Sequence, residues 1–431
     1  MELREVYLVD AKRTAQAKAG AELMEVAVPH LGIGAVRNML DRANTPNDLV
    51  DEVIIGNTGA PAKYTNIGRI VALESGLDMK TSAYTVHRNC ASGLEAISQG
   101  VLKIGAGAAN FIVAGGIESM SQMPLIYSKE MTKLFADVMR AKTLSKKFKA
   151  ISTFRPPYLS PIVAIEQGLT DPFCGLNMGQ TAEVLAREFD ITRQDQDEYA
   201  LESHRKALLA RSENKFADEI VPLLIGKKLD KLFDEDSGPR PDCSMEKLAK
   251  LRPYFEKKSG TVTVGNACPI TDGGSAVLLA SEDVVKTYAL EPMAKIISCG
   301  FAGLEPERMG MGPLVAIDKV LRQTNMTMDQ FDLVEINEAF AAQVIAVRKA
   351  LKDKKAAARF GVDRVIGDIP DEKLNVNGGA IALGHPVGST GCRLVVTLAH
   401  ELKKRNAKYG LASLCIGGGQ GGACIIENLQ N

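Results

Sequence analysis

Short apolar runs alternate with segments of helical periodicity in the first part of the chain. Strands are predicted at 5–10, 53–55 and 110–116, and helices at 29–43 and from Cys90 to Lys103. Two of the runs end at glycine, at Gly56 and at the pair Gly115–Gly116. Such alternation of strand and helix patterns predicts an α/β layered fold.

The C-terminal third repeats this layout. A helical pattern at 390–404 precedes an apolar run at 410–418, which again ends in paired glycines. The C-terminal ends of strands and the N-terminal ends of helices lie along one edge of such sheets. We therefore predict two copies of one β-α-β arrangement, each carrying reactive residues at that edge.

The stretch between these halves, 121–267, differs in character and is predicted to be an insertion. It contains the proline-rich segment 154–161 and a charged helical pattern at 192–214. Its segment 129–155 holds eight basic and two acidic residues. Met131, Leu134, Phe135 and Val138 recur there at helical spacing and predict a short helix with one apolar face.

Composition narrows the possible functions. The chain of 431 residues has 52 basic and 52 acidic residues, with 45% hydrophobic and 24% charged residues. This neutral, ordinary globular mixture argues against nucleic-acid binding, disorder and coiled coil. Charges at Arg4 and Glu5 interrupt any signal-peptide core, and no stretch is apolar enough to span a membrane, so we expect a cytoplasmic protein.

Eight cysteines are spread along the chain without a CxxC pair. That pattern predicts neither a metal site nor a disulfide framework, and in a cytosolic chain most of these thiols should be reduced and buried.

Cys90 is the first candidate for chemistry. It follows a strand-like segment and precedes a helix that opens with Ala91, Ser92 and Gly93. The positive end of a helix lowers the pKa of a nearby thiol, and the thiolate is the nucleophile. A buried structural cysteine is the commoner alternative for any lone cysteine.

His385 lies in a glycine-rich segment between Gly384 and Pro386, and a histidine held in this way is a candidate catalytic base. A structural histidine is the alternative reading. His204, in the charged helical pattern, and His400, at a helix end, are interpreted as surface residues.

Two further residues end apolar strands. Cys415 enters the loop GGGQGG, whose backbone amides could form an oxyanion hole. The loop is followed by another apolar run and not by a helix, which argues against a dinucleotide site. Asn337 lies between a strand and a helix, and a helix N-cap is its simpler interpretation.

Together these elements resemble the thiolase family. The matching motifs are NCASG at 89–93, GGIESMS at 115–121, NEAF at 337–340, GHP at 384–386 and CIGGGQG at 415–421. Further matches are DAKRT at 10–14, NMGQTAE at 177–183, KLRPYF at 250–255 and GTVTVGNA at 260–267. They appear in the family's order over nearly the whole chain.

The resemblance implies the thiolase fold, with two similar five-layered α/β/α/β/α halves and an inserted loop domain. Residues 1–120 plus 268–291 would form the N-terminal domain, 121–267 the loop domain that binds coenzyme A and substrate, and 292–431 the C-terminal domain. It also implies a homodimer or homotetramer.

The resemblance further implies coenzyme A-dependent cleavage of a 3-ketoacyl-CoA, with no metal and no covalently bound cofactor. Cys90 would be the acyl-accepting nucleophile, His385 its base, and Cys415 the acid/base for the α-carbon and for the coenzyme A thiol. Asn337 would orient a water that holds the thioester oxygen together with His385. The amides of Cys90 and Gly417 would hold the acyl-enzyme oxygen.

Other residues are implied to contact substrate: Asn177, Met178, Arg240, Cys268 and Phe340. Short-chain, acetoacetyl-CoA thiolases usually have HMG at 177–179 and serine at 268, which this chain lacks. Segments 140–161 and 352–370 resemble the thiolase subunit of the fatty-acid oxidation trifunctional complex, although those subunits often carry HEAF at 337–340. A degradative thiolase of fatty-acid β-oxidation is favoured, and an acetoacetyl-CoA thiolase is the alternative.

Two other classes of protein are alternatives to a thiolase. A ketoacyl synthase shares the fold but lacks the second thiol, and Cys415 argues against it. A non-catalytic thiolase-like lipid carrier is disfavoured because all four catalytic positions are filled.

A hydratase/dehydrogenase partner subunit is possible. For the basic stretch 129–155, an apolar face packed on the protein's own body is preferred over a peripheral membrane contact.

Overall fold

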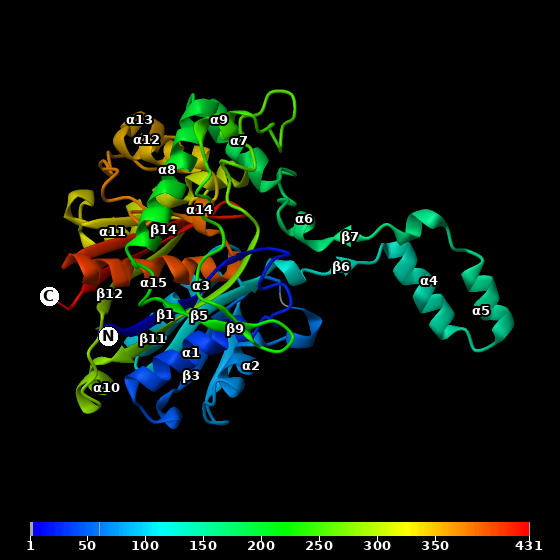
Figure 1. The fold of residues 1–431 in the computed structure, drawn as a ribbon, viewed down its shortest axis with the longest axis horizontal. Helices are drawn as coiled ribbons and strands as arrows, with labels where there is room; N and C mark the ends of the chain where they lie inside the picture. The colour runs from blue at the N-terminus through cyan, green and yellow to red at the C-terminus, as the bar shows by residue number, and fades with distance from the viewer. Residues whose placement is uncertain (1–2, 60, 431) are drawn as a thin grey trace.

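One continuous sheet runs through the computed structural model, which describes residues 3–59 and 61–430 (Figure 1). In spatial order its strands are β4 (Ser82–Val86), β3 (Glu52–Gly56), β5 (Phe111–Ser119), β11 (Thr271–Ser281), β1 (Val6–Thr14), β12 (Ala294–Gly303), β15 (Gln420–Asn428), β14 (Tyr409–Ile416) and β13 (Leu333–Ile336). The short strands β2 (Ala17–Lys18) and β8 (Ile220–Val221) pair with β11 and β1.

The two halves of this sheet have the same topology. In the first half β4, β3 and β5 are parallel, and β11 runs antiparallel between β5 and β1. In the second half β13 and β14 are parallel, and β15 runs antiparallel between β14 and β12. The counterpart of β4 is reduced to a single bridge between Val334 and Leu374. The predicted internal repeat is therefore present.

The helices complete five layers that the two halves build together. The helices of the repeat are α1 (His30–Ala43), α2 (Ile67–Glu74) and α3 (Ser92–Gly105) in the first half, and α11 (Gly312–Thr324), α12 (Ala341–Lys352) and α15 (Val387–Arg405) in the second. Helices α3 and α15 pack on each other and on the strands around them, whereas α1 covers β1 and β11, and α11 covers β12 and β15. The central α3–α15 layer brings the starts of two equivalent helices together.

Glycine permits this close approach. A Cβ at Gly93 in α3 would lie 2.8 Å from the backbone nitrogen of Cys392, and a Cβ at Gly391 in α15 would lie 2.7 Å from that of Leu94. Each glycine of the repeat thus meets the opposite helix where a side chain would collide. The helices end up packed with Leu94 and Leu394 almost fully buried.

The remaining elements lie mostly between β5 and β11. They are β6 (Leu125–Ile126), α4 (Lys129–Arg140), α5 (Leu144–Ile151), β7 (Ile162–Val163), α6 (Ala164–Gly168), α7 (Met178–Glu188), α8 (Arg193–Ser212), β9 (Leu223–Ile225), β10 (Lys231–Phe233) and α9 (Met245–Ala249). The short helices α10 (Glu282–Thr287), α13 (Lys354–Ala358) and α14 (Ala380–Leu383) belong to the rest of the chain. Helices α7 and α8 pack against α12, and α8 also packs against α14.

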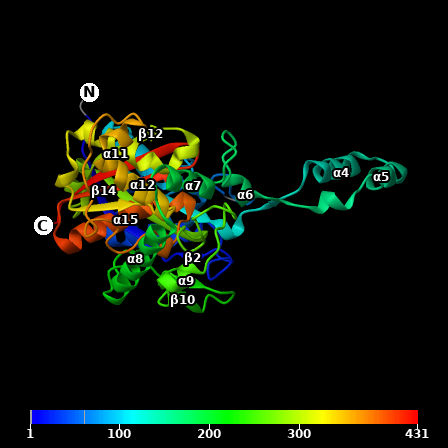
Figure 2. The same cartoon turned by 90° about the horizontal axis from the view of Figure 1, so that it is seen from above.

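Helices α4 and α5 form an arm that stands away from the body in both views (Figures 1 and 2). The two-stranded ladder β6–β7 joins this arm to the body, with Leu125 opposite Val163. The apolar face predicted for this segment is divided: Met131 and Leu134 are buried, while Phe135 is 39% exposed. The arm therefore packs mainly on itself and not on the body.

Three sequence-based expectations need correction. His204 and His400 are buried, not surface residues, with 4% and 6% exposure, because α8 and α15 are covered by neighbouring elements on those faces. The glycine-rich segment before α15 is more helical than expected, since it contains α14 and α15 begins at Val387.

All eight cysteines are free thiols, as expected, although five of them are only partly buried. Within residues 3–59 and 61–430, no helix has the length and apolarity needed to cross a bilayer.

Candidate active site

Cys90 occupies a tight turn between β4 and α3. Asn89 adopts the left-handed conformation with φ 45°, and the Ser92 hydroxyl donates to its carbonyl at 2.7 Å. The Arg88 backbone N–H donates to the same hydroxyl at 2.9 Å. These two hydrogen bonds fix the turn, which places Cys90 at the edge of the sheet, immediately before α3.

The resting state of Cys90 differs from the sequence-based expectation. Burial raises the pKa of this thiol, and the carboxylate of Glu118 acts in the same direction. The backbone N–H groups of Gly417 and of Cys90 itself favour the thiolate but do not outweigh burial. The expectation of a pKa lowered by the helix end is therefore wrong, and Cys90 needs a base to become nucleophilic.

Cys415 lies near the end of β14, the counterpart of β5 in the second half. Strand β14 ends just after it, and a three-residue turn of Gly417, Gly418 and Gly419 leads into β15, with φ 89° and 75° at the last two. Burial raises the pKa of Cys415 well above its ordinary value, and Cys90 and Cys268 raise it further. The three thiols are thus close enough to influence one another.

A direct bond joins the two loops. The Asn89 side-chain amide donates to the Gly417 carbonyl at 2.7 Å. Arg88 also donates to the side chain of Gln420 at 3.0 Å. The turn that carries Cys90 is therefore held against the turn that follows Cys415.

His385 is fixed as a neutral imidazole. The hydroxyl of Thr390 lies 2.5 Å from Nδ1 and donates its own proton to the Pro386 carbonyl at 3.0 Å. The hydroxyl must therefore accept the proton of Nδ1, which leaves Nε2 with a free lone pair. Burial, with a smaller effect of Arg393, lowers the pKa of His385 to about 3.

Asn337 faces that free nitrogen. Its side-chain nitrogen is 3.5 Å from Nε2 of His385, and its backbone N–H donates to the Ser413 carbonyl at 2.9 Å. Its side-chain oxygen is buried and has no partner among the described residues. An unpaired buried oxygen of this kind is a place for a water or a substrate group.

Glu338 anchors the segment around Asn337. Its carboxylate accepts hydrogen bonds from Ser203, Asn375 and the Ile381 backbone at 2.6, 2.9 and 3.2 Å. The Asn337 segment is in this way fixed to α8 and α14.

A cavity of about 790 Å³ opens onto Cys90. Its lining includes Met178, Gly417, Met120 and Phe173 and is mainly apolar. Met178 also packs with Phe340 and Cys415 in one buried cluster. Cys268 lies beside this cluster, with its N–H donating to the Ala339 carbonyl at 3.0 Å. Of the residues named from the sequence, Cys90, Met178 and Gly417 line this cavity, and Cys415, Phe340 and Cys268 lie beside it.

Two residues named from the sequence, Asn177 and Arg240, do not line the Cys90 cavity. Asn177 caps α7: its side chain accepts from the Gln180 backbone at 2.9 Å, and its N–H donates to the Gln180 side chain at 2.9 Å. Arg240 is exposed outside the Cys90 cavity, and its backbone N–H donates to His204 at 3.3 Å.

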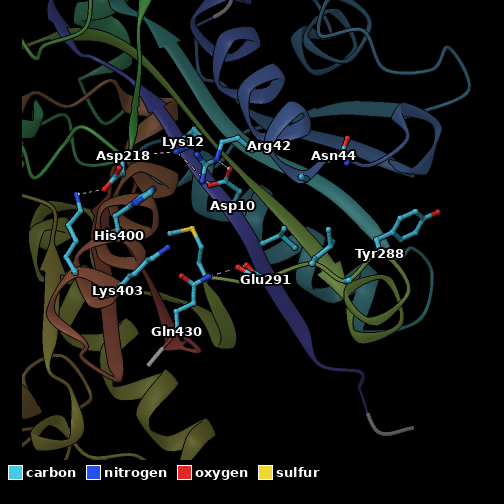
Figure 3. Close-up of a pocket in the computed structure, with 16 residues that line it drawn as sticks. Asp10, Lys12, Arg42, Asn44, Asp218, Tyr288, Glu291, His400, Lys403 and Gln430 are labelled. Carbon is cyan, nitrogen blue, oxygen red and sulfur yellow. Dashed lines mark hydrogen bonds and ion pairs between the residues drawn. The ribbon is translucent and has the colours of Figure 1, made fainter.

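A second cleft, of about 680 Å³, lies between β1 and the end of α15 (Figure 3). Two of its cations are paired within the cleft: Arg42 with Asp10 at 3.0 Å, and Lys404 with Asp218 at 3.2 Å. Lys12 donates to the Asp218 carbonyl. The cleft has no thiol, so the Cys90 cavity is the candidate active site.

Sequence analysis missed Glu118 and Thr390. Glu118 is fully buried at the end of β5 and binds the loop after β3 and the start of α15. A single carboxylate after the apolar run 111–117 was the available signal, because a buried charge must be hydrogen-bonded. Thr390 carried no signal, since its role depends on the fold of the first turn of α15.

The match to family models decides the identity. Residues 6–283 match the model of the thiolase N-terminal domain, and residues 290–428 match that of the thiolase C-terminal domain. The chain belongs to the thiolase family. The predicted family and thiolase fold are confirmed.

Individual relatives cover nearly the whole chain. An acetyl-CoA acetyltransferase of Chromobacterium violaceum is 41% identical over 425 residues, 98% of this chain and 99% of that protein. The mitochondrial trifunctional enzyme subunit beta of Bos taurus is 37% identical over 428 residues, 99% of this chain and 88% of that protein.

A crystal structure of human mitochondrial 3-ketoacyl-CoA thiolase in complex with CoA has a TM-score of 0.85 and 36% identity, and the match covers 99% of both chains. Together these matches identify this thiolase as an acyltransferase.

Proposed function

We propose that this thiolase cleaves a 3-ketoacyl-CoA with coenzyme A, through an acyl group carried on Cys90, and that it also catalyses the reverse condensation. The main support is that Cys90 and Cys415 lie at adjoining turns, held together by the bond from Asn89 to the Gly417 carbonyl, and that Cys90 raises the pKa of Cys415. A nucleophile and a separate acid/base are what this reaction requires.

The first half-reaction begins with proton transfer from Cys90 to Nε2 of His385, the nitrogen left free by Thr390. The thiolate attacks the keto carbon, and the backbone amides of Cys90 and Gly417, which point at the sulfur, hold the resulting oxyanion. The bond between the α- and β-carbons breaks, and acetyl-CoA leaves as its enolate. The shortened acyl group remains on Cys90.

Cys415 handles the protons of the remaining steps. Its raised pKa keeps it protonated, so it can donate to the enolate carbon. The Cys415 thiolate then takes the proton of the incoming coenzyme A thiol, which attacks the acyl group and frees Cys90. One residue cannot serve both roles, because Cys90 is acylated when the enolate is protonated.

Asn337 and His385 complete the site at the thioester oxygen. The unpaired oxygen of Asn337 is suited to hold a water next to the neutral imidazole of His385. That water and the protonated His385 would donate to the enolate oxygen when negative charge develops there.

For the substrate, we propose a chain longer than acetoacetyl, processed in fatty-acid β-oxidation. The mainly apolar cavity, with Met120, Ile165 and Phe173 in its wall, and Cys268 in place of serine support this. The alternative is an acetoacetyl-CoA thiolase, which is what the name of the Chromobacterium relative favours.

We propose that coenzyme A enters as co-substrate and that its phosphates are held by the inserted segment, with Arg240 as the candidate contact. The CoA complex of the human relative supports the ligand, and the exposed side chain of Arg240 is free to bind it. A homodimer or homotetramer in the cytoplasm, and a hydratase/dehydrogenase partner, are part of the same proposal. The name of the bovine relative supports the partner.

Turnover of acetoacetyl-CoA and longer 3-ketoacyl-CoA substrates tests the proposal. The native chain should release acetyl-CoA only when coenzyme A is present, and Cys90→Ala should not. Cys243→Ala, a partly buried thiol outside the cavity, is the matched control and should keep full turnover. A chain that binds acyl-CoA without turnover would be a lipid carrier and would contradict the proposal.

A further inference from the structure

The arm formed by α4 and α5 carries an apolar surface that the rest of the molecule does not cover. On α5, Leu144, Phe148 and Ile151 are 75%, 69% and 51% exposed, and no residue of this helix is buried. Spacings of four and three residues place these side chains on one face of the helix. Figures 1 and 2 both show α5 at the far end of the arm, away from the body.

Other apolar side chains of the arm are exposed as well. Met139, at the end of α4, is 85% exposed, and Leu125 and Tyr127 beside the connecting strands are 67% and 58% exposed. Scattered apolar residues are normal on a protein surface, but apolar side chains gathered on one face of a projecting helix, as on α5, mark a contact site.

Unpaired cations surround this surface. The segment 129–155 carries an excess of six positive charges, and because the whole chain is neutral, the remainder carries an equal negative excess. Within the described part of the chain, the side chains of these arm residues form no ion pair: Lys129, Lys133, Arg140, Lys142, Lys146, Lys147 and Lys149. The helical spacing of α5 places Lys146 and Lys149 on the side away from the apolar face, and Lys147 at the border of that face.

We infer that the α4–α5 arm docks on the surface of an anionic phospholipid bilayer. An amphipathic helix with exposed leucine and phenylalanine on one face and lysines on the other lies in the interface between headgroups and acyl chains. Each lysine near such a surface adds electrostatic attraction. A second copy of the arm fits less well, because it would bring two strongly positive segments together.

The position of the arm connects this docking with the cavity. Pro124 and Ala164, which flank the β6–β7 ladder, line the same cavity as Cys90. An arm lying on a bilayer would therefore hold the opening of the cavity near the lipid surface. The inference concerns only location and is independent of the substrate proposed above.

Sedimentation of the full chain with vesicles tests the inference. Vesicles of phosphatidylcholine with phosphatidylglycerol should carry the protein down at low salt, and vesicles of phosphatidylcholine alone should not. High salt should reduce binding at least tenfold, because it screens the lysines. Absence of binding at low salt, or equal binding to both kinds of vesicle, would overturn the inference.

Two arm variants and one control assign the contact. The charge reversal Lys146→Glu, Lys147→Glu, Lys149→Glu and the apolar change Leu144→Ser, Phe148→Ser, Ile151→Ser should each reduce binding at least tenfold. The control Lys227→Glu, Lys228→Glu, Lys231→Glu makes the same charge change around β9 and β10, where the three lysines are likewise exposed, and should bind normally.

Turnover of acetoacetyl-CoA without vesicles should be the same in all of these proteins and reports on their folding. Retained vesicle binding in both arm variants would refute the docking. The docking would also be refuted if the native chain does not bind vesicles and the arm variants have a lower oligomeric mass than the native chain. The arm would then be a contact between copies.

Discussion

The carboxylate of Glu118 accepts a hydrogen bond from the Gly388 backbone N–H at 2.9 Å, across 270 residues of sequence. The same carboxylate accepts from the backbone N–H groups of Thr58 and Gly59 at 3.0 and 3.1 Å. Gly388 lies in the first turn of α15, three residues after His385. Glu118 therefore fixes the start of the helix behind the proposed base to a loop of the first half.

Replacing Glu118 with glutamine should misplace that helix start. One acceptor oxygen becomes an NH₂ group that faces N–H donors, so the start of α15, and with it His385, loses its fixed position relative to the loop at Thr58 and Gly59. We expect kcat to fall by up to about 10²-fold, since small displacements of reacting groups have effects of that size. Steady-state turnover measures this loss.

A second readout separates positioning from general destabilisation. The carboxylate of Glu118 raises the pKa of Cys90, so Glu118→Gln should lower that pKa, measured from the pH dependence of alkylation by iodoacetamide. The control Glu95→Gln removes a carboxylate that pairs with Arg88 at 2.7 Å in the same region. An unchanged pKa of Cys90 together with unchanged kcat would contradict the positioning role.

Cys415→Ala should separate the two half-reactions. With acetyl-CoA, the variant should still form the acetyl group on Cys90, because His385 and the two amides are intact. Carbon–carbon cleavage and formation should fall by about 10²- to 10⁴-fold, since no group remains to protonate the enolate. Mass spectrometry and turnover measure the two effects, and a variant that cannot be acetylated would refute the assignment.

Much of the fold was predictable because local and global signals agree. The apolar runs before Gly56 and Gly115 became β3 and β5, and the helical patterns became α1, α3 and α15 within a few residues. The repeat was visible because Gly93 and Gly391 are needed for one close contact between α3 and α15. Local pattern could not show that the two half-sheets are joined by β1 and β12.

The site was predictable where chemistry and turn geometry coincide in the sequence. Cys90, His385 and Cys415 all stand next to small or glycine residues that the turns require. The pKa of Cys90 was not predictable, because it depends on burial by segments far apart in the chain. The burial of His400 was not predictable for the same reason. Its partner, the Ala11 carbonyl, lies at the other end of the chain.

Arg240→Ala should raise the KM for coenzyme A several-fold and leave kcat nearly unchanged. The guanidinium is exposed and would contact a phosphate far from the reacting atoms, so it affects binding in the ground state and transition state alike. Arg205→Ala is the control, because it removes the same charge from an exposed arginine beside His204. An unchanged KM in Arg240→Ala would place the nucleotide elsewhere.

The pH dependence of stability should report on His400. Burial lowers the pKa of His400 to about 4, and its Nε2–H donates to the Ala11 carbonyl at 2.8 Å. Lys12 and Lys404 lower this pKa further, while the Ala11 carbonyl and Asp10 raise it. The unfolded chain binds a proton here below about pH 6.5, and the folded protein does so only near pH 4.

The contribution of His400 to stability is therefore complete above about pH 6.5 and declines as the pH falls toward 4, by up to about 1.4 kcal/mol per pH unit. His400→Gln keeps a donor for Ala11 but does not titrate. The variant should be the less stable protein at pH 7, and its deficit should shrink by about 2 kcal/mol at pH 5. Urea unfolding at both pH values measures this change. Parallel losses in the two proteins, or an NMR signal showing that His400 is protonated in the folded protein at pH 5, would contradict the neutral, buried state of this histidine.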